Sequence, residues 1–135
     1  MATKSAVTTA HFNGSPVVVL GGRAPDYRWG QGALQELDHP PLLAPVTKWA
    51  TTVHSPGAVP EQLDHAFTVA AAAHRGPVFL DVGLEHLYDQ AEVVLPDVAP
   101  RAVSLPDPDD VADVARRLAA AQRPVLVLGG DVWLD

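Results

Sequence analysis

The stretch Pro16-Val-Val-Val-Leu-Gly-Gly22 is an unbroken apolar run bounded by proline and glycine. A run without polar alternation is typical of a strand that is buried on both faces of a parallel sheet. Pro77-Val-Phe-Leu-Asp-Val82 and Pro124-Val-Leu-Val-Leu-Gly-Gly130 follow the same pattern. We therefore expect strands at 16–20, 78–82 and 124–128, and the glycine pairs close the first and last of them.

Helical patterns alternate with these strands. Residues 5–12 predict the end of a helix that stops at Asn13-Gly14. A second helix is expected to begin at Pro60, and a third after the N-cap residue Asp107, with Pro108 in its first position. Their predicted buried stripes are Leu63, Phe67, Ala70 and His74 for the second, and Val111, Val114, Leu118 and Ala121 for the third. With a short strand at 46–53, this alternation predicts an α/β fold with a doubly wound parallel sheet.

Composition limits the functions that the chain can have. Its 135 residues fit about one domain, and 16 acidic against 9 basic residues give a net charge of −7. That charge argues against nucleic acid or an anionic membrane as partner. The chain has no cysteine, which excludes disulfides and thiolate metal sites and is compatible with a cytoplasmic location. No apolar run has the length of a membrane span, and no signal peptide is evident.

No complete catalytic or metal-binding motif is present. The six histidines contain no i, i+4 pair and no HExxH, so we expect no metal site. No serine lies in GxSxG, and neither glycine pair belongs to GxGxxG, which makes a dinucleotide-binding domain the weaker interpretation. The glycine pairs are either tight turns or places where a cofactor approaches the backbone. The richest segment is the loop from Arg23 to Lys48, which is either solvated or functional.

Four motifs in this order resemble a known family: Pro16-Val-Val-Val-Leu-Gly-Gly-Arg-Ala-Pro25, Gly30-Gln-Gly-Ala-Leu-Gln-Glu36, Pro45-Val-Thr-Lys48 and Gly76-Pro-Val-Phe-Leu-Asp81. They are similar to the second half of the pyrimidine-binding domain of thiamine-diphosphate (ThDP) enzymes. The most similar branch is the acetolactate synthase large-subunit type, in particular its actinobacterial members. Arg123-Pro-Val-Leu-Val-Leu-Gly-Gly130 resembles the first strand of the central domain of these enzymes.

The resemblance implies a domain organisation. Residues 1–88 would be the C-terminal half of a pyrimidine-binding domain, 89–106 a proline-rich linker, and 107–135 the start of the central domain. Both ends of the chain interrupt the doubly wound pattern, so we expect a segment of a larger enzyme with a partial sheet.

The resemblance also implies which residues border the substrate. Gln35 would face the reacting carbon of the thiamine adduct, and Leu34 takes the place of an aromatic residue that contacts substrate. Pro25 and Lys48 match positions that line the substrate channel, where Lys48 would attract a carboxylate. Gly129 and Gly130 would lie near FAD.

Other family parts have no counterpart in this sequence. The glutamate that activates ThDP lies upstream in the family, and Glu36, Glu61, Glu85 and Glu92 do not match it. The Gly-Asp-Gly…Asn segment that holds diphosphate and Mg²⁺ is absent. We therefore expect no catalytic or metal-binding residue here, and no binding of ThDP, Mg²⁺ or FAD by the chain alone.

The implied parent enzyme decarboxylates a 2-keto acid such as pyruvate and transfers the two-carbon unit to an acceptor, as a homo-oligomer. Gln31-Gly32 replaces the Thr-Asp of biosynthetic members, and Trp49 replaces a polar residue. Oxalyl-CoA decarboxylase and 2-hydroxyacyl-CoA lyase types are therefore alternatives. A non-catalytic remnant or interaction module is another.

Overall fold

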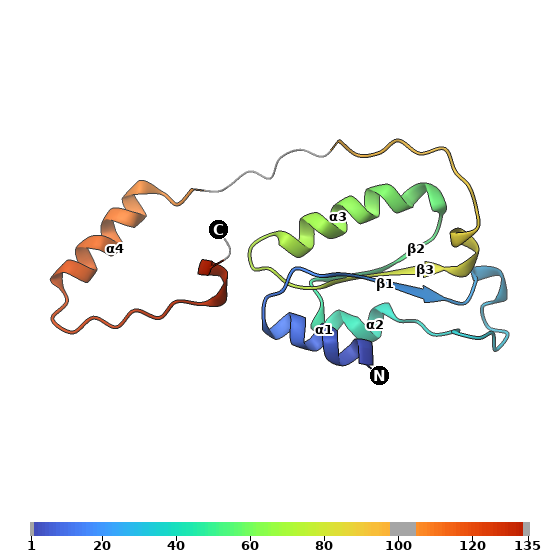
Figure 1. The fold of residues 1–135 in the computed structure, drawn as a ribbon, viewed down its shortest axis with the longest axis horizontal. Coiled ribbons are helices and arrows are strands. Elements are labelled where there is room, and N and C mark those ends of the chain that lie inside the picture. Colours follow the sequence, from blue (N-terminus) through green and yellow to red (C-terminus); the bar gives the residue numbers. More distant parts are fainter. Residues whose placement is uncertain (1, 98–104, 134–135) are drawn as a thin grey trace.

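The computed structural model describes residues 2–97 and 105–133 (Figure 1). The first part contains three strands and three helices. These are α1 (Ala2–Phe12), β1 (Val18–Arg23), α2 (Pro40–Leu43), β2 (Trp49–Val53), α3 (Val59–Ala71) and β3 (Val78–Gly83). Short 3-10 turns join them: η1 (Asp26–Arg28), η2 (Ala44–Val46), η3 (Pro56–Ala58) and η4 (Leu84–Leu87).

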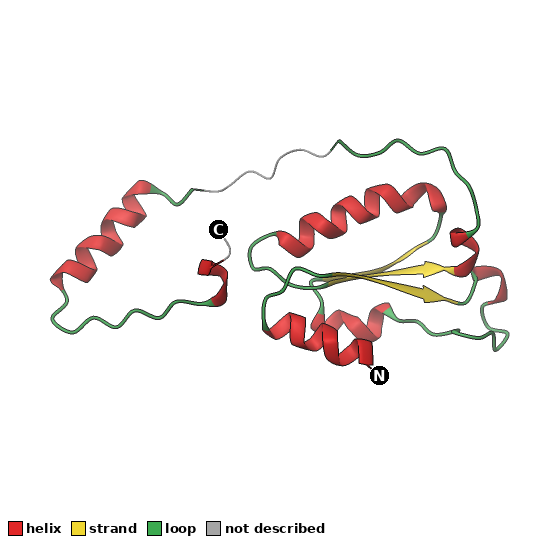
Figure 2. Ribbon diagram, viewed as in Figure 1, coloured by secondary structure: helices red, strands yellow, loops and turns green. Residues whose placement is uncertain are grey.

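The three strands form a parallel sheet with β3 at its centre, in the order β1-β3-β2. Val78 begins β3 and is paired with Val18 on one side and Trp49 on the other, so all three strands start together. Figure 2 shows α3 on one face of the sheet and α1 with α2 on the other. This arrangement confirms the predicted α/β class with a partial doubly wound sheet.

Central strand β3 is buried on both faces because it alternates between two cores. Val78 and Leu80 pack with Val53, Ala66 and Ala70 beneath α3. Phe79, between them in sequence, packs on the opposite face with Val7 of α1 and Leu43 of α2. A strand with a helix layer on each side has no solvent face, which explains its continuous apolar sequence.

The glycine pair at 21–22 lies inside β1, and the expectation that it closes the strand is wrong. β1 continues to Arg23, whose partner in the register is Gly83. A Cβ on Gly21 would lie 2.5 Å from Cζ of Phe79, so this position must remain small for the aromatic ring to pack. A Cβ on Gly22 would meet nothing within 4 Å.

The predicted helix at Pro60 is confirmed, and its predicted buried face is correct at Ala70 but not at Phe67. Ala66 and Ala70 are buried, whereas Phe67 is 60% exposed. Small residues let α3 lie close to the sheet, and a bulky side chain at their positions would push it away. The helix ends at Ala71, so His74 lies beyond it and does not extend the stripe. The predicted strand at 46–53 starts only at Trp49, because Ala44–Val46 forms η2.

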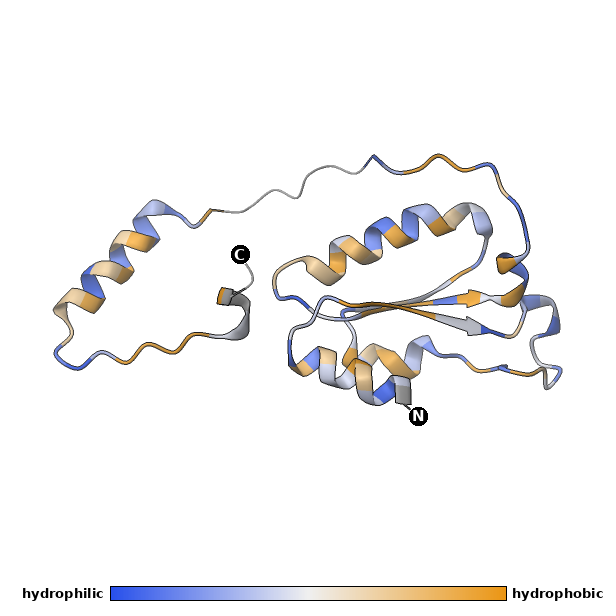
Figure 3. Ribbon diagram, viewed as in Figure 1, coloured by the Kyte–Doolittle hydropathy of each residue, from blue (hydrophilic) through white to orange (hydrophobic). Residues whose placement is uncertain are grey.

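The second part contains helix α4 (Pro108–Ala120) and the 3-10 turn η5 (Gly130–Trp133). The predicted cap is confirmed, since the Asp107 carboxylate accepts a hydrogen bond of 2.8 Å from the backbone N–H of Asp109. The stripe predicted to be buried is exposed at Val111, Val114 and Leu118. Residues 124–128 form no strand in the described structure, because no neighbouring strand pairs with them. They appear as the hydrophobic segment before η5 in Figure 3.

The expected linker is irregular where it is described, at 89–97 and 105–106, and its residues 98–104 lie outside the described part. None of the helices in the described ranges has the length and apolar character needed to cross a membrane.

Candidate functional site at the carboxyl edge of the sheet

All three strands end at one edge of the sheet, and the segments that follow them meet there. Parallel α/β sheets bind ligands at this carboxyl edge. β1 is followed by the loop 24–38, β2 by His54 and β3 by η4. This edge is the candidate functional site.

The loop after β1 is held in one shape by its own backbone and by one carboxylate. The N–H of Ala24 donates to the carbonyl of Gln35 at 3.0 Å, which ties the far end of the loop to the strand. Glu36 accepts hydrogen bonds of 2.9 Å from the N–H groups of both Gly30 and Ala33. These backbone hydrogen bonds, the one from Ala33 first, lower the pKa of Glu36.

Gln35 has a positive φ of 64°, a conformation that few residues other than glycine adopt. Glycine occupies two other left-handed positions of the loop, Gly30 at 81° and Gly32 at 71°. Leu34 is 89% exposed at the outer part of the loop. A strained, hydrogen-bonded backbone therefore presents Leu34 and Gln35 to the outside of the sheet edge.

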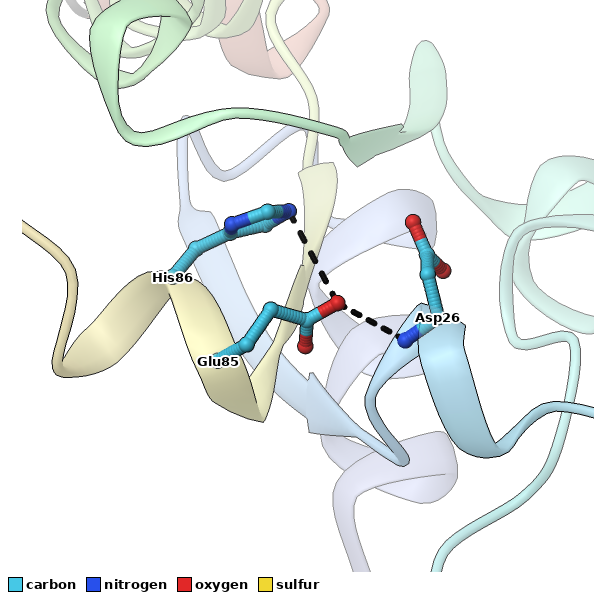
Figure 4. A group of neighbouring side chains, drawn as sticks. All are labelled: Asp26, Glu85 and His86. Carbon is cyan, nitrogen blue, oxygen red and sulfur yellow. Dashed lines mark hydrogen bonds and ion pairs between the residues drawn. The ribbon is translucent and has the colours of Figure 1, made fainter.

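Charged side chains connect the loop to the ends of the other two strands. Arg23 pairs with Asp26 and stacks 4.6 Å from the ring centre of Trp29. The N–H of Asp26 donates to Oε1 of Glu85 at 2.7 Å, which joins the segments after β1 and β3 (Figure 4). His54, after β2, lies 3.3 Å from Oδ2 of Asp26. One network thus spans the carboxyl ends of all three strands.

The structure brings together three of the four residues predicted to line a channel and separates the fourth. Pro25, Leu34 and Gln35 all lie in the loop after β1. Lys48 precedes β2 and therefore lies at the amino ends of the strands, at the edge of the sheet opposite to the candidate site. Its Nζ donates to the carbonyls of Val69 and Ala72 at 2.5 and 2.9 Å, at the end of α3. Its role in a channel remains a prediction.

Gly129 and Gly130 belong to the second part of the chain, where Gly130 begins η5. Both are exposed, and a Cβ on either would meet nothing within 4 Å. Their predicted place near FAD remains a prediction.

A groove of about 660 Å³ runs along β1 on the face covered by α1 and α2. Lys4, Gly21, Gly22, Leu37 and His39 are among its lining residues. The glycine backbone of β1 is therefore open to a neighbouring group on this face. The approach of a cofactor to this backbone stays a prediction.

Sequence patterns did not identify the group Asp26, Glu85 and His86. Asp26 and Glu85 are 59 positions apart, so no motif spacing links them. The available signal was topological: each residue comes within a few positions of the end of a parallel strand. Residues that follow such strands meet at one edge whatever their separation along the chain.

The comparisons with known proteins agree with this architecture. No family model matches the chain. An acetolactate synthase large subunit of Mycobacterium tuberculosis is 39% identical over 96% of this chain and 24% of its own length. A benzoylformate decarboxylase of Pseudomonas aeruginosa is 33% identical over 94% of this chain and 25% of its own length. A thiamine-diphosphate-dependent 4-hydroxybenzoylformate decarboxylase of Rhodococcus jostii superposes with a TM-score of 0.80, at 28% identity, over 94% of this chain and 25% of that one.

The parallel sheet and its carboxyl-edge loop define a doubly wound α/β protein. Within that class, the chain is homologous to acetolactate synthase large subunits and benzoylformate decarboxylases, and its fold is similar to that of a thiamine-diphosphate-dependent decarboxylase. It spans about a quarter of the length of the curated relatives that it matches.

Proposed function

We propose that the chain supplies one side of the active site of a ThDP-dependent enzyme that decarboxylates a 2-keto acid and transfers the two-carbon unit. The observation that supports this most directly is the fixed loop 24–38. Hydrogen bonds from Ala24 and to Glu36 hold its backbone, and Leu34 and Gln35 project from it. A preorganised loop can position a reacting group with little loss of entropy on binding.

The described residues do not by themselves fit the coenzyme. Binding of its aminopyrimidine needs a carboxylate with an accessible free oxygen at the site. Both oxygens of Glu36 accept backbone hydrogen bonds, and the free oxygen of Glu85, Oε2, is buried. Glu36 accepts from Gly30 and Ala33, and Glu85 accepts from Asp26. We therefore propose that the activating glutamate, the diphosphate and Mg²⁺ site and any FAD site lie in other parts of the enzyme.

The domain organisation belongs to the same proposal. Residues 1–88 form half of a pyrimidine-binding domain, 89–106 a linker, and 107–135 the beginning of a central domain. In this arrangement Gly129 and Gly130 would approach FAD where FAD is present. The sheet formed by β1, β2 and β3, with its core inside residues 1–88, supports the first of these units.

The proposal has a direct test in two arms. The purified 135-residue chain, supplied with pyruvate, ThDP, Mg²⁺ and FAD, should produce no acetolactate. In a second arm, these 135 residues replace the matching segment of the Mycobacterium tuberculosis acetolactate synthase large subunit. The resulting chimera should show ThDP-dependent turnover. Turnover by the isolated chain, or a correctly folded chimera with no ThDP-dependent activity on any 2-keto acid or oxalyl-CoA, would contradict the proposal.

Gln35 provides the sharper measurement in the chimera. Gln35→Ala should lower kcat/KM by about 10–100-fold, the usual cost of a misplaced reacting group. Gln90→Ala, at an exposed position outside the loop, should leave it unchanged. Comparing pyruvate, benzoylformate and oxalyl-CoA as substrates distinguishes acetolactate synthesis from the alternative activities.

Exposed apolar residues on α4 favour association of the chain with another protein surface. Val111, Val114 and Leu118 lie along one side of α4, and all three are exposed in the described structure. Apolar surface of this kind commonly marks a protein interface. We propose that the chain self-associates or binds the rest of its enzyme there. Sedimentation should show oligomers that Val114→Asp weakens and Ala112→Asp, on another side of α4, does not.

A further inference from the structure

We propose that Asp26, Glu85 and His86 bind a divalent transition-metal ion, such as Zn²⁺, at the carboxyl edge of the sheet. Each residue offers one ligand atom, and these atoms all lie within 4.8 Å of one another. Figure 4 shows one oxygen of the Glu85 carboxylate between the ring of His86 and the backbone nitrogen of Asp26, with Glu85 and His86 in η4 and Asp26 in η1. The proposal concerns a site separate from the loop residues Leu34 and Gln35, and it does not depend on the enzymatic activity proposed above.

Unsatisfied polar atoms are the independent sign of a missing ligand. Oε2 of Glu85 and both ring nitrogens of His86 are buried and have no hydrogen-bond partner. The side chains of Glu85 and His86 are only 16% and 11% exposed. A buried polar group without a partner costs about 1–3 kcal/mol, so the two ring nitrogens of His86, next to a carboxylate with an unpartnered oxygen, require an explanation. A metal ion coordinated by this carboxylate and imidazole would provide partners for atoms of both residues.

The surroundings of His86 match those of a metal-bound imidazole. Its Nε2 lies 3.9 Å from Oε1 of Glu85, and its Nδ1 lies 3.7 Å from Oδ2 of Asp89. Both separations are too long for hydrogen bonds. Histidine ligands commonly turn their second nitrogen toward a carboxylate, which fixes the ring and strengthens the ligand. Asp89 is placed to serve as that positioning residue.

The donor set selects a class of metal. Two carboxylates and one imidazole suit Zn²⁺, Mn²⁺ or Fe²⁺, whereas Mg²⁺ and Ca²⁺ prefer oxygen ligands alone. Zinc ligands lie about 2.0–2.2 Å from the ion and hence about 3–4 Å from each other. The observed limit of 4.8 Å therefore requires the side chains to close by less than about 2 Å. Rotation of exposed Asp26 can supply much of that movement.

Neighbouring charges also define the coordination. Oδ1 of Asp26 pairs with Arg23, which leaves Oδ2 as the oxygen available to an ion. His54 lies 3.3 Å from that same Oδ2 and is the nearest candidate for a fourth ligand. Asp26, Glu85 and Asp89 bring three carboxylates to this group, and Arg23 pairs with one of them, so the local charge favours a cation.

Calorimetric titration of the full chain with ZnCl₂ tests the site. We expect one high-affinity ion per chain, weakened at least tenfold by His86→Gln and by Glu85→Gln. Asp89→Asn should weaken it about tenfold, in line with other positioning residues. His65→Gln is the matched control, because His65 packs on Trp49 away from this edge and should not change binding.

Cobalt substitution gives a second readout that requires no enzyme activity. Co²⁺ should produce a visible absorption band that Zn²⁺ removes and equimolar Mg²⁺ does not. Circular dichroism checks that each variant is folded. If His86→Gln does not fold, the Glu85→Gln variant carries the test. The proposal is overturned if the folded chain binds no Zn²⁺, if a folded His86→Gln or Glu85→Gln variant binds it as tightly as the original, or if Mg²⁺ displaces Co²⁺ at equal concentration.

Discussion

Nδ1 of His39 lies 3.0 Å from Oδ2 of Asp81, whose side chain is completely buried in the middle of β3. Burial raises the pKa of Asp81, and the hydrogen bond and charge of His39 oppose that rise. Because the folded-state pKa of Asp81 lies above its unfolded value, the contribution of Asp81 to the free energy of unfolding is greatest below the unfolded pKa. It falls as pH rises through the folded pKa and the buried carboxylate becomes charged.

His39→Gln should therefore destabilise the fold more above the pKa of Asp81 than below it. Without the imidazole, the charged carboxylate is buried with less compensation, a loss of about 1–3 kcal/mol. Thermal unfolding over a series of pH values from acidic to neutral measures the difference. Asp81→Asn removes the titrating group, so it should flatten the pH dependence. An equal effect of His39→Gln at every pH would contradict this explanation.

Gly21→Ala should destabilise the sheet, because the added methyl group would lie 2.5 Å from the ring of Phe79. Overpacking of this kind costs about 1–3 kcal/mol. Gly22→Ala is the matched control, since its Cβ would meet no atom within 4 Å. Urea unfolding of both variants gives the comparison. Equal stability of the two would show that Phe79 moves aside without cost.

Glu36→Ala should loosen the loop 24–38 without unfolding the sheet. The N–H groups of Gly30 and Ala33 would lose their shared acceptor. Amide hydrogen exchange, followed by NMR, should become faster at these two residues and remain unchanged in β3. The pKa of Glu36 is lowered, so its contribution is present above the unfolded pKa and lost as pH falls through the folded pKa. Glu61→Ala, on the outside of α3, is the control.

Lys48→Met should fray the last turn of α3. The ammonium group donates to two carbonyls at that end of the helix, where a positive charge is favourable. We expect a loss of about 1 kcal/mol, because the group is exposed and screened by solvent. Lys4→Met, on α1, removes the same charge without this contact.

The same substitution tests the channel role predicted for Lys48. In the chimeric enzyme, a lysine that attracts a keto-acid carboxylate would raise KM when it is replaced. A lysine that only caps α3 would leave KM unchanged.

The sequence was sufficient for β3 and for the capped helix α4, because burial on both faces and an Asp-Pro helix start have clear local signatures. The sequence was not sufficient where a residue's packing or pairing depends on a neighbour in space that is distant in the chain. Gly21 resembled a turn residue, but it serves the packing of Phe79. Phe67 matched a helical stripe but is exposed, whereas Ala70 of the same stripe and Ala66, outside it, are the buried residues of α3. The segment 124–128 has the composition of a strand but no partner to pair with.

The candidate site residues also differ in whether the sequence alone shows that they lie close together. Pro25, Leu34 and Gln35 lie in one loop because they are close in sequence, whereas Lys48 lies at the other edge of the sheet. The role of all four residues in a substrate channel stays a prediction. The group of Asp26, Glu85 and His86 was missed, because sequence spacing does not report which strand ends lie next to each other.

The loop that carries Gln35 extends from β1, and in the described structure β1 pairs with a neighbour on one side only. Its other side offers backbone N–H and C=O groups to any additional strand. A strand that joined there would stiffen the base from which Gln35 projects. The precision with which this residue meets a substrate would then be set by whatever completes the sheet.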